Sequence, residues 1–359
     1  MIQKRKKEHV EIVLQKGAQA HYNFWQDINL VHCALPEISR NCLSLRTNFL
    51  GRSLSAPFII SAMTGGFAGA EKINANLAQA AQTLQIGFGV GSQRPALVDP
   101  KLIRTYTVVK KYTPALVLAN IGAPQLLPQG KEPGLAVDQL TSIMEMVNAH
   151  ALAVHLNFAQ EVHQREGNQD AQGCLQALRE TAKHLPVVAK ETGGGISREV
   201  ATQLSSAGVK AIDIGGAGGT SFPAVESFRD QGQGRQQRKA RLFWDWGIPA
   251  PASLVESRAG VPLIASGGIR SGLDAAKAIA LGADLVGIAF PLLEPATVSL
   301  KATVEVLNKF LDEFEDALFL TGSSDLASLK KKAVVITGPT AQWLSARGYK
   351  LEQWAQRGC

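Results

Sequence analysis

The chain has 359 residues, of which 45% are hydrophobic and 19% are charged, a balance that supports a large buried core and excludes a disordered polypeptide. This length exceeds the ~100–200 residues of an ordinary domain but suits one large α/β barrel. No uninterrupted apolar run approaches the ~20 residues that cross a bilayer, so we expect no membrane partner. Glycine is in excess: 34 of the 359 residues, about 9.5%, are glycine, against an ordinary share of about 7%. These glycines fall in short clusters.

Positive charge exceeds negative charge by 7, and much of the excess lies in residues 4–7 and in the segment 229–241. Such runs are either solvated surface, or two basic segments that close over an anionic small molecule. Both interpretations stay open from the charge alone. A local anion site is favoured over a nucleic-acid interface, so we expect no nucleic-acid partner.

The four cysteines are scattered, without a C-x-x-C pair or a Cys/His set at zinc spacing. The pattern predicts neither a disulfide framework nor a structural metal, and it favours a reducing, cytoplasmic location. The basic N-terminal residues are not followed by the 7–15-residue apolar stretch of a secretory signal, which is consistent with that location.

From about residue 57 the chain repeats one unit: a short apolar run, a polar or glycine-rich turn, and a longer stretch with helical spacing. The apolar runs are typical of parallel strands buried on both faces, and eight are predicted: 58–62, 86–90, 115–120, 151–157, 187–191, 211–215, 262–266 and 284–289. Five intervening segments are predicted as helices: 68–83, 135–150, 174–184, 199–207 and 273–281. Eight such units favour a (β/α)8 TIM barrel over a doubly wound sheet.

The barrel is predicted to span residues 57–320, and the residues before and after it are predicted to cover it. An N-terminal cap spans 1–56, and a C-terminal helical tail spans 321–359, which Trp343 and Trp354 would dock. Residues 227–241 contain almost no apolar side chain, so we expect a mobile loop there, on the catalytic side of the barrel.

Glycine-rich turns follow most of the predicted strands, at the end of the barrel where active sites are built. Those after 262–266 and 284–289 resemble the recurring barrel phosphate site, in which backbone N–H groups and a helix N-terminus hold an anion. Small residues after the first three strands would admit a flat ring. Any one cluster could be a tight turn without a ligand, but together they describe flavin mononucleotide (FMN).

Polar side chains gather after the strand 151–157, where His155 and Asn157 are predicted to point to the same side and Gln160 and Glu161 follow. One carboxylate without a His or Cys ligand set fits Mg²⁺, which takes one or two carboxylates plus substrate phosphate. Lys190 ends the next strand, where burial would be costly without an anionic partner. It either reaches the solvated rim or lies at the polar edge of the flavin, where it stabilises the reduced ring.

These segments closely resemble type 2 isopentenyl diphosphate isomerase, an FMN-dependent barrel enzyme. The resemblance extends from about residue 4 to beyond 300, and includes Arg5, Lys6 and His9 with the motifs MTGG, GVGSQR, NIGA, HLNxxQE, VVAKETGGGIS, DIGGAGGTSF, DWGIPAPASL and ASGGIRSGLDAAKAIALGAD. It implies reversible conversion of isopentenyl diphosphate to dimethylallyl diphosphate, by proton addition and removal at reduced FMN, with Mg²⁺ and with NADPH as reductant. It also implies a homo-oligomer, a tetramer or octamer.

The resemblance assigns roles residue by residue. It implies FMN contacts for Ala62, Met63, Thr64, Ser92, Asn120, Lys190, Thr220, Gly267, Gly268, Arg270, Ala289 and Phe290. It implies substrate contacts for Arg5, Lys6, Gln93, Arg94, His155 and Gln160, and a metal contact for Glu161. The catalytic set is Gln160, Glu161, His155 and Lys190, and the cap segment 1–56 becomes part of the substrate site.

Three rival functions fit the sequence less well. An FMN-dependent 2-hydroxy-acid oxidase or dehydrogenase resembles the chain in fold, but its general-base histidine follows the sixth strand, and residues 208–228 contain no histidine. A barrel with a thiol nucleophile, like inosine monophosphate dehydrogenase, would need a cysteine in the same loop. A non-catalytic flavin-binding protein would not require Gln160, Glu161 and the basic N-terminus.

Overall fold

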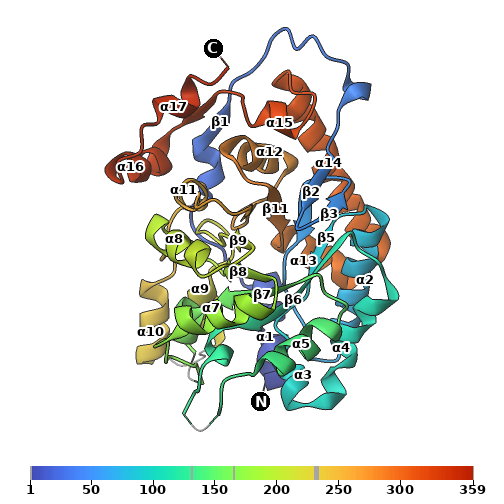
Figure 1. Cartoon of the computed structure of the whole chain (residues 1–359), viewed down its shortest axis with the longest axis vertical. Coiled ribbons are helices and arrows are strands. Elements are labelled where there is room, and N and C mark those ends of the chain that lie inside the picture. Colours follow the sequence, from blue (N-terminus) through green and yellow to red (C-terminus); the bar gives the residue numbers. More distant parts are fainter. Residues whose placement is uncertain (1, 131, 165, 230–233, 359) are drawn as a thin grey trace.

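Eight parallel strands close into a barrel at the centre of the computed structural model, which describes residues 2–130, 132–164, 166–229 and 234–358 (Figure 1). Chain order is kept around the barrel, and each strand pairs with the next until β11 returns to β4. The strands are β4 (Phe58–Ile60), β5 (Gly87–Gly89), β6 (Leu116–Gly122), β7 (Ala151–Leu156), β8 (Val187–Glu191), β9 (Ala211–Asp213), β10 (Leu263–Ala265) and β11 (Leu285–Ile288). The predicted TIM barrel is therefore confirmed, and each strand overlaps its predicted run.

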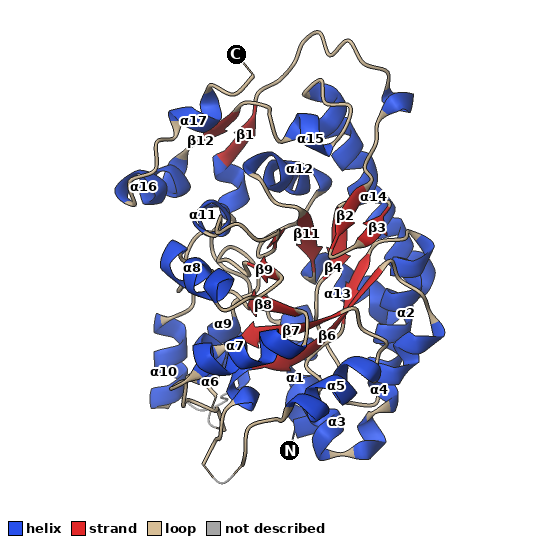
Figure 2. Cartoon of the chain, in the orientation of Figure 1, coloured by secondary structure: helices blue, strands red, loops and turns tan. Residues whose placement is uncertain are grey.

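Helices surround the barrel and cap its ends (Figure 2). The five predicted helices are present as α2 (Ala70–Thr83), α5 (Val137–Glu145), α7 (Cys174–His184), α8 (Arg198–Ser206) and α12 (Gly272–Leu281). The longer additional helices are α1 (Ile2–Gln15), α9 (Phe222–Arg229), α10 (Arg235–Leu242), α11 (Ala250–Glu256), α13 (Phe290–Val298), α14 (Leu300–Leu320) and α16 (Gly338–Ala346). Short helices are α3 (Arg94–Val98), α4 (Arg104–Thr107), α6 (Phe158–Glu161), α15 (Leu326–Leu329) and α17 (Glu352–Ala355).

Side chains inside the barrel change from apolar to polar along the strands. Alternate strand residues face the same side, so Leu116 and Leu118 share their face with Asn120, and Val188 shares its face with Lys190. The apolar members belong to one buried cluster, which the hairpin of β2 (Thr47–Phe49) and β3 (Arg52–Leu54) joins through its own apolar side chains. The hairpin closes the amino-terminal end of the barrel, and the carboxyl-terminal end is left polar.

A segment from the N-terminal part of the chain and one from the C-terminal part pair in a small sheet outside the barrel, although the two termini lie far apart (Figure 1). Strand β1 (Ile28–Leu30) pairs antiparallel with β12 (Val334–Ile336). Trp354 is buried, whereas Trp343 is partly exposed and donates its indole N–H to Glu256 at 2.8 Å. Both tryptophans therefore contact the rest of the protein, and the domain boundaries at 56 and 320 stay a prediction.

The segment predicted as a loop, 227–241, is largely helical. Helix α9 ends at Arg229 and α10 begins at Arg235, while residues 230–233 lie outside the described part of the chain. The loop prediction is wrong for the helical residues, because a helix needs only a narrow apolar contact. Ala240 supplies one such contact, and Phe228 of α9 packs against Trp244, which follows α10, with ring centroids 5.6 Å apart. No helix in the described residues is long and apolar enough to span a membrane.

Candidate active site

A large cavity opens at the carboxyl ends of the barrel strands, beneath helix α1. Its volume is about 1300 Å³, including the part open to solvent. Helix α1 crosses the mouth and lines it with Lys6, His9, Val10 and Val13. This end of a TIM barrel is where active sites are built, so we take the cavity as the candidate active site.

All 12 residues predicted to contact FMN line this cavity, and they come from the ends of seven of the eight strands. Of the residues predicted to bind substrate, Lys6, His155 and Gln160 also line it. Arg5, Gln93, Arg94 and the predicted metal ligand Glu161 lie outside the lining. The contacts with FMN and substrate themselves stay predictions.

Glycine allows the loops after β9 and β10 to pack backbone against backbone. Gly267 and Gly268 have φ of +94° and +81°, a region that residues with a Cβ rarely adopt. A Cβ on Gly267 would lie 2.0 Å from Gly216 O, and a Cβ on Gly268 would lie 2.7 Å from Gly218 O. Trp25 fixes the turn from outside by donating its indole N–H to Gly267 O at 2.8 Å. The cavity wall here is therefore backbone, as a bound phosphate requires.

Several polar groups on the cavity wall have spare hydrogen-bonding capacity. Ser61 Oγ and Thr64 Oγ1 are buried without a hydrogen-bond partner among the described residues. The Arg270 guanidinium donates to neutral acceptors, the Gln19 side chain and the Ile269 backbone, and lies 4.9 Å from the ring centroid of Phe290. Burial lowers the pKa of Arg270 to about 10, which leaves it a cation at neutral pH. A bound phosphate with a polar ring would supply the missing partners.

The imidazole of His155 is neutral and has a defined tautomer. Asn120 donates its amide to Val90 O at 3.0 Å, so its Oδ1 is free to accept, and His155 Nδ1 lies 2.7 Å from that oxygen. The proton is therefore on Nδ1, and Nε2 carries the lone pair. Burial, and then the positive charges of Lys6 and Lys190, lower the pKa of His155 to about 3.

Asn157 does not face the cavity as predicted. Strand β7 ends at Leu156, and Asn157 has φ of −94° and ψ of 32° at the start of α6, so the strand alternation used for the prediction stops one residue earlier. Its amide donates to Glu161 Oε1 at 2.8 Å, and Glu161 Oε2 accepts from the backbone N–H of Asn168 at 2.7 Å. Asn157 Oδ1 is buried without a hydrogen-bond partner among the described residues. Two oxygen-bearing side chains are thus held together beside the cavity.

The basic N-terminus divides its charges between solvent and cavity. Lys4 and Lys7 are exposed and pair with acidic residues one helical turn away on α1. Lys6 points inward, where burial and then the charge of Arg5 lower its pKa to about 8. His9 lies 2.9 Å from the buried carboxylate of Glu226. The solvated-surface interpretation therefore holds for Lys4 and Lys7, and for Lys6 the contact with an anion stays a prediction.

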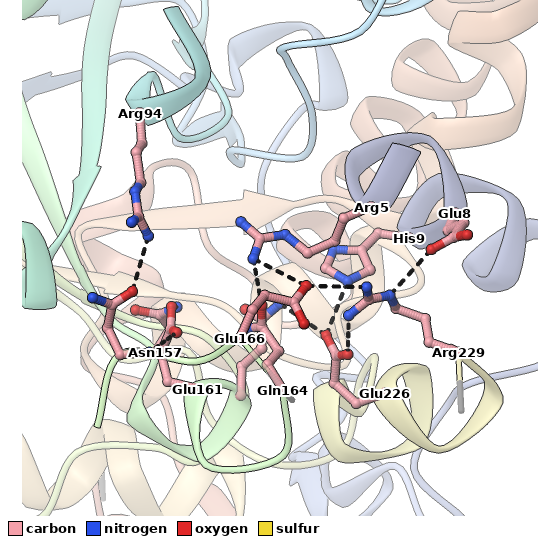
Figure 3. A network of polar contacts seen from close by, with 12 residues as sticks. Arg5, Glu8, His9, Arg94, Asn157, Glu161, Gln164, Glu166, Glu226 and Arg229 are labelled. Carbon is pink, nitrogen blue, oxygen red and sulfur yellow. Dashed lines mark hydrogen bonds and ion pairs between the residues drawn. The ribbon is translucent and has the colours of Figure 1, made fainter. Parts of the chain in front are cut away.

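A network of ion pairs ties α1 to the loop after α6 and to α9 (Figure 3). Arg5 donates to Gln164 at 3.0 Å and lies 3.4 Å from Glu166. Arg229 bridges three carboxylates, Glu8, Glu166 and Glu226, at 3.3, 3.2 and 2.5 Å. Arg229 begins the basic segment 229–241, one of the two segments that could close over an anion. Because three carboxylates already neutralise it, it acts here as a structural tie.

Gln93 and Arg94 have protein partners of their own. Gln93 is fully buried, donates to Ile143 O at 2.8 Å and accepts from Asn120 N at 2.9 Å, so both ends of its carboxamide are occupied. Arg94 donates to Asn168 at 3.0 Å and lies 3.4 Å from Glu132. Gln93 thus has the contacts of a packing residue. Arg94, at the start of α3, contacts Asn168, whose backbone N–H also donates to Glu161.

Some residues of the cavity were not assigned a role from sequence. Phe222 and Leu293 add apolar surface beside Val10 and Val13 of α1. Glu191 also lines the cavity, and its Oε2 accepts from the backbone N–H groups of residues 192–195 at 2.5–3.1 Å. Burial raises the pKa of Glu191 to about 7, against the lowering effect of these bonds. The glycine run after it was visible in the sequence and could have indicated such a loop-binding carboxylate.

Metal ligands are sparse. Among the described residues, no group of three or more His, Cys, Asp or Glu side chains lies close enough to hold a metal ion. A single carboxylate can still take part in a Mg²⁺ site that substrate phosphate and water complete.

Known proteins resemble this chain in sequence and in fold. Residues 101–336 match the family model described as FMN-dependent dehydrogenase. An isopentenyl-diphosphate delta-isomerase of Methanosarcina barkeri is 44% identical over 99% of this chain and 98% of its own length. A second protein of that name, from Methanothrix thermoacetophila, is 48% identical over 96% of each chain.

Solved structures agree with the fold. A flavocytochrome b2 variant with bound pyruvate superimposes with a TM-score of 0.63 at 17% identity, covering 93% of this chain and 84% of that one. A mandelate oxidase variant with an FMN adduct has a TM-score of 0.59 at 16% identity, covering 87% and 89% of the two chains. At these identities the likeness concerns the fold alone.

Proposed function

Because the chain belongs to the isopentenyl-diphosphate delta-isomerase family, we propose that it interconverts isopentenyl diphosphate and dimethylallyl diphosphate with FMN as cofactor. One observation carries the proposal: a single cavity is lined by the whole predicted FMN set together with the cation Lys6, the polar His155 and Gln160, and apolar residues of α1. A diphosphate needs the cations, and a five-carbon hydrocarbon group needs the apolar wall.

FMN fits the residues on the cavity wall. The backbone at Gly267 and Gly268, with Arg270 and the N-terminal end of α13, would hold its phosphate. The partnerless hydroxyls of Ser61 and Thr64 would hydrogen-bond polar atoms of the bound group. When bound and reduced, FMN supplies the acid and base for moving a proton between two carbons.

The chain's own residues would bind and orient the substrate. Lys6 carries a positive charge at neutral pH and Arg5 lies beside it, so both favour a diphosphate at the mouth. His155 offers a lone pair on Nε2, and the charge of a nearby diphosphate would raise its pKa and turn it into a second donor. Helix α1 covers the mouth and would exclude water from the reacting carbons.

Proton transfer by a side chain is poorly supported in this cavity. Glu191 is the carboxylate among the described lining residues, and its Oε2 accepts hydrogen bonds from four backbone N–H groups. Protonation of this oxygen would weaken those bonds, which disfavours proton transfer through it. Its role is then to shape the loop after β8. Gln160, which can orient a ligand but does not ionise, lines the cavity nearby.

Mg²⁺ fits Glu161 as part of the diphosphate site. Each of its carboxylate oxygens accepts one hydrogen bond and keeps further acceptor capacity, and the partnerless Asn157 Oδ1 belongs to the same cluster. One carboxylate with substrate phosphate oxygens and water is an ordinary Mg²⁺ environment. We propose NADPH as the reductant of FMN from the sequence resemblance.

We also propose a cytoplasmic homo-oligomer, a tetramer or octamer. The described cysteines, Cys33, Cys42 and Cys174, are free thiols, as a reducing compartment favours, and Cys359 lies outside the described residues. Leu242 and Trp246 are 80% and 65% exposed, and contact with another copy would bury them.

The test separates this function from that of a 2-hydroxy-acid oxidase. The two histidines on the described cavity wall, His9 and His155, come from α1 and β7, whereas the oxidase needs a base after β9. FMN-loaded protein, reduced anaerobically with Mg²⁺ present, should convert isopentenyl diphosphate to dimethylallyl diphosphate, and the oxidised protein should not. Oxidation of lactate or glycolate by the oxidised protein, without isomerisation by the reduced one, would overturn the proposal.

A further inference from the structure

Three neighbouring strands bring three polar side chains together in the uppermost layer of the barrel interior. Lys190 of β8 is in register with Asp213 of β9. Asp213 is also in register with Ile264 of β10, and Ser266 follows Ile264 by two residues. Each of the three follows an apolar interior residue by two positions, so each faces inward. Lys190 and Ser266 line the cavity, and Asp213 lies beneath them, outside the lining.

Asp213 is the carboxylate that meets the Lys190 ammonium. Asp213 Oδ2 lies 2.8 Å from Lys190 Nζ, and their side chains are only 6% and 12% exposed. Ser266 donates its hydroxyl to the other oxygen, Oδ1, and itself accepts from Gly215 N at 3.2 Å. Both oxygens of Asp213 are therefore engaged, and its position is fixed from two strands.

The ammonium of Lys190 has one donor left for the cavity. Of its three N–H groups, one meets Asp213 and a second donates to the backbone oxygen of Glu191 at 3.1 Å. The Glu191 carboxylate is turned to the following loop, where backbone N–H groups bind it. Among the other titratable residues of the lining, Lys6 and Arg270 are cations and His155 is neutral. Asp213 thus provides the close negative charge.

We propose that Asp213 is a positioning residue that fixes the Lys190 ammonium toward the flavin and offsets part of its charge. The inference rests on the proposed contact of Lys190 with FMN, and it adds a residue that does not touch the cofactor. A cation beside the flavin favours the reduced, negatively charged ring, and a buried carboxylate behind that cation weakens this preference. The pair therefore sets how strongly the protein prefers reduced FMN over oxidised FMN.

The test measures FMN affinity in both redox states and needs no isoprenoid substrate. Apoprotein is titrated anaerobically with oxidised and with reduced FMN at one fixed pH, the same for every protein. The readout is the dissociation constant of oxidised FMN divided by that of reduced FMN. The proteins are wild type, Asp213→Asn, Lys190→Met, the double variant and Ser266→Ala, which keeps both charges.

Asp213→Asn should raise this ratio about tenfold, because a unit charge is removed from a buried site close to the ring. Lys190→Met should lower it by a similar factor, the double variant should return near wild type, and Ser266→Ala should change it less than about twofold. A purely structural Asp213 would weaken both affinities equally and leave the ratio unchanged.

The outcomes separate the inference from its premise. If Lys190→Met leaves the ratio unchanged, the proposed lysine contact fails and the inference falls with it. If Lys190→Met lowers the ratio but Asp213→Asn does not raise it, only the role of Asp213 is overturned. The double variant buries no unpaired charge, so it remains measurable even if Asp213→Asn folds poorly.

Discussion

Acidification should destabilise the folded protein through His155. An unfolded histidine takes up a proton below about pH 6.5, whereas the folded protein lowers the pKa of His155 to about 3 by burial and by the charges of Lys6 and Lys190. Between these values the unfolded chain binds a proton that the folded chain does not. The contribution of His155 to stability is therefore complete above about pH 6.5 and is lost as the pH falls toward 3.

The size of the effect follows from the distance to the ordinary pKa. About pH 4.5 lies some two pH units below the ordinary histidine pKa. At ~1.4 kcal/mol per unit, proton uptake by His155 in the unfolded chain then lowers the free energy of unfolding by about 2.5 kcal/mol. Urea unfolding followed by tryptophan fluorescence, at about pH 7 and about pH 4.5, compares wild type with His155→Gln and with the matched control His32→Gln, at an exposed site.

His155→Gln should lose about 2.5 kcal/mol less stability than wild type over this pH interval, because glutamine does not titrate. His32→Gln should follow wild type. Equal losses in wild type and His155→Gln would refute the argument, since His155 would then be protonated as readily in the folded as in the unfolded chain. The same result would remove the neutral tautomer on which the proposed substrate contact depends.

Three further variants test the cofactor and metal contacts. Glu161→Gln should raise the Mg²⁺ concentration for half-maximal activity at least about tenfold while FMN stays bound, and loss of FMN would count against the metal role. Arg270→Met should weaken FMN binding to the apoprotein about tenfold or more by losing a charged partner of the phosphate, and an unchanged affinity would contradict that contact. Gly267→Ala should lower the free energy of unfolding by about 2–4 kcal/mol, because its Cβ would lie 2.0 Å from Gly216 O. The control Gly260→Ala, at φ +80° in open space, should lower it by only about 1 kcal/mol. Equal costs at the two glycines would show that the loops can separate.

The barrel could be predicted because its strands are short, continuous apolar runs. A strand such as Val187–Glu191 is buried on both faces, so its sequence has little ambiguity, and the glycine-rich turn after it marks the carboxyl end. That the residues predicted to contact FMN line one cavity could be anticipated for the same reason, since they follow strands directly. In a barrel, position along the chain then implies position around the mouth.

Predictions were weaker where a side chain's direction depends on one local dihedral. Asn157 was placed by strand alternation, but the strand ends at Leu156 and the amide turns to Glu161. Gln93 lies beside a cavity residue in sequence, and only the fold reveals that backbone groups occupy its carboxamide. Low apolar content in 227–241 suggested a loop, whereas ion pairs such as that between Arg229 and Glu226 stabilise helices there.

Contacts between distant strands were invisible in the sequence. Asp213 reads as an ordinary residue near the end of a strand, and its pairing with Lys190 depends on the register of β8 with β9. The sheet of β1 with β12 likewise joins segments more than 300 residues apart in the chain. A single sequence carries no signal for such pairings, because each partner has an adequate local explanation.

Solvent deuterium incorporation tests the central claim most directly, because it follows the proton that the isomerisation must add. Reduced, FMN-loaded protein with Mg²⁺ is given isopentenyl diphosphate in D₂O, and the product is analysed by mass spectrometry and NMR. The account predicts dimethylallyl diphosphate that carries deuterium in the methyl group formed from the methylene carbon, without net consumption of reductant. Absence of dimethylallyl diphosphate, or its formation with one reductant consumed per turnover, would contradict the account.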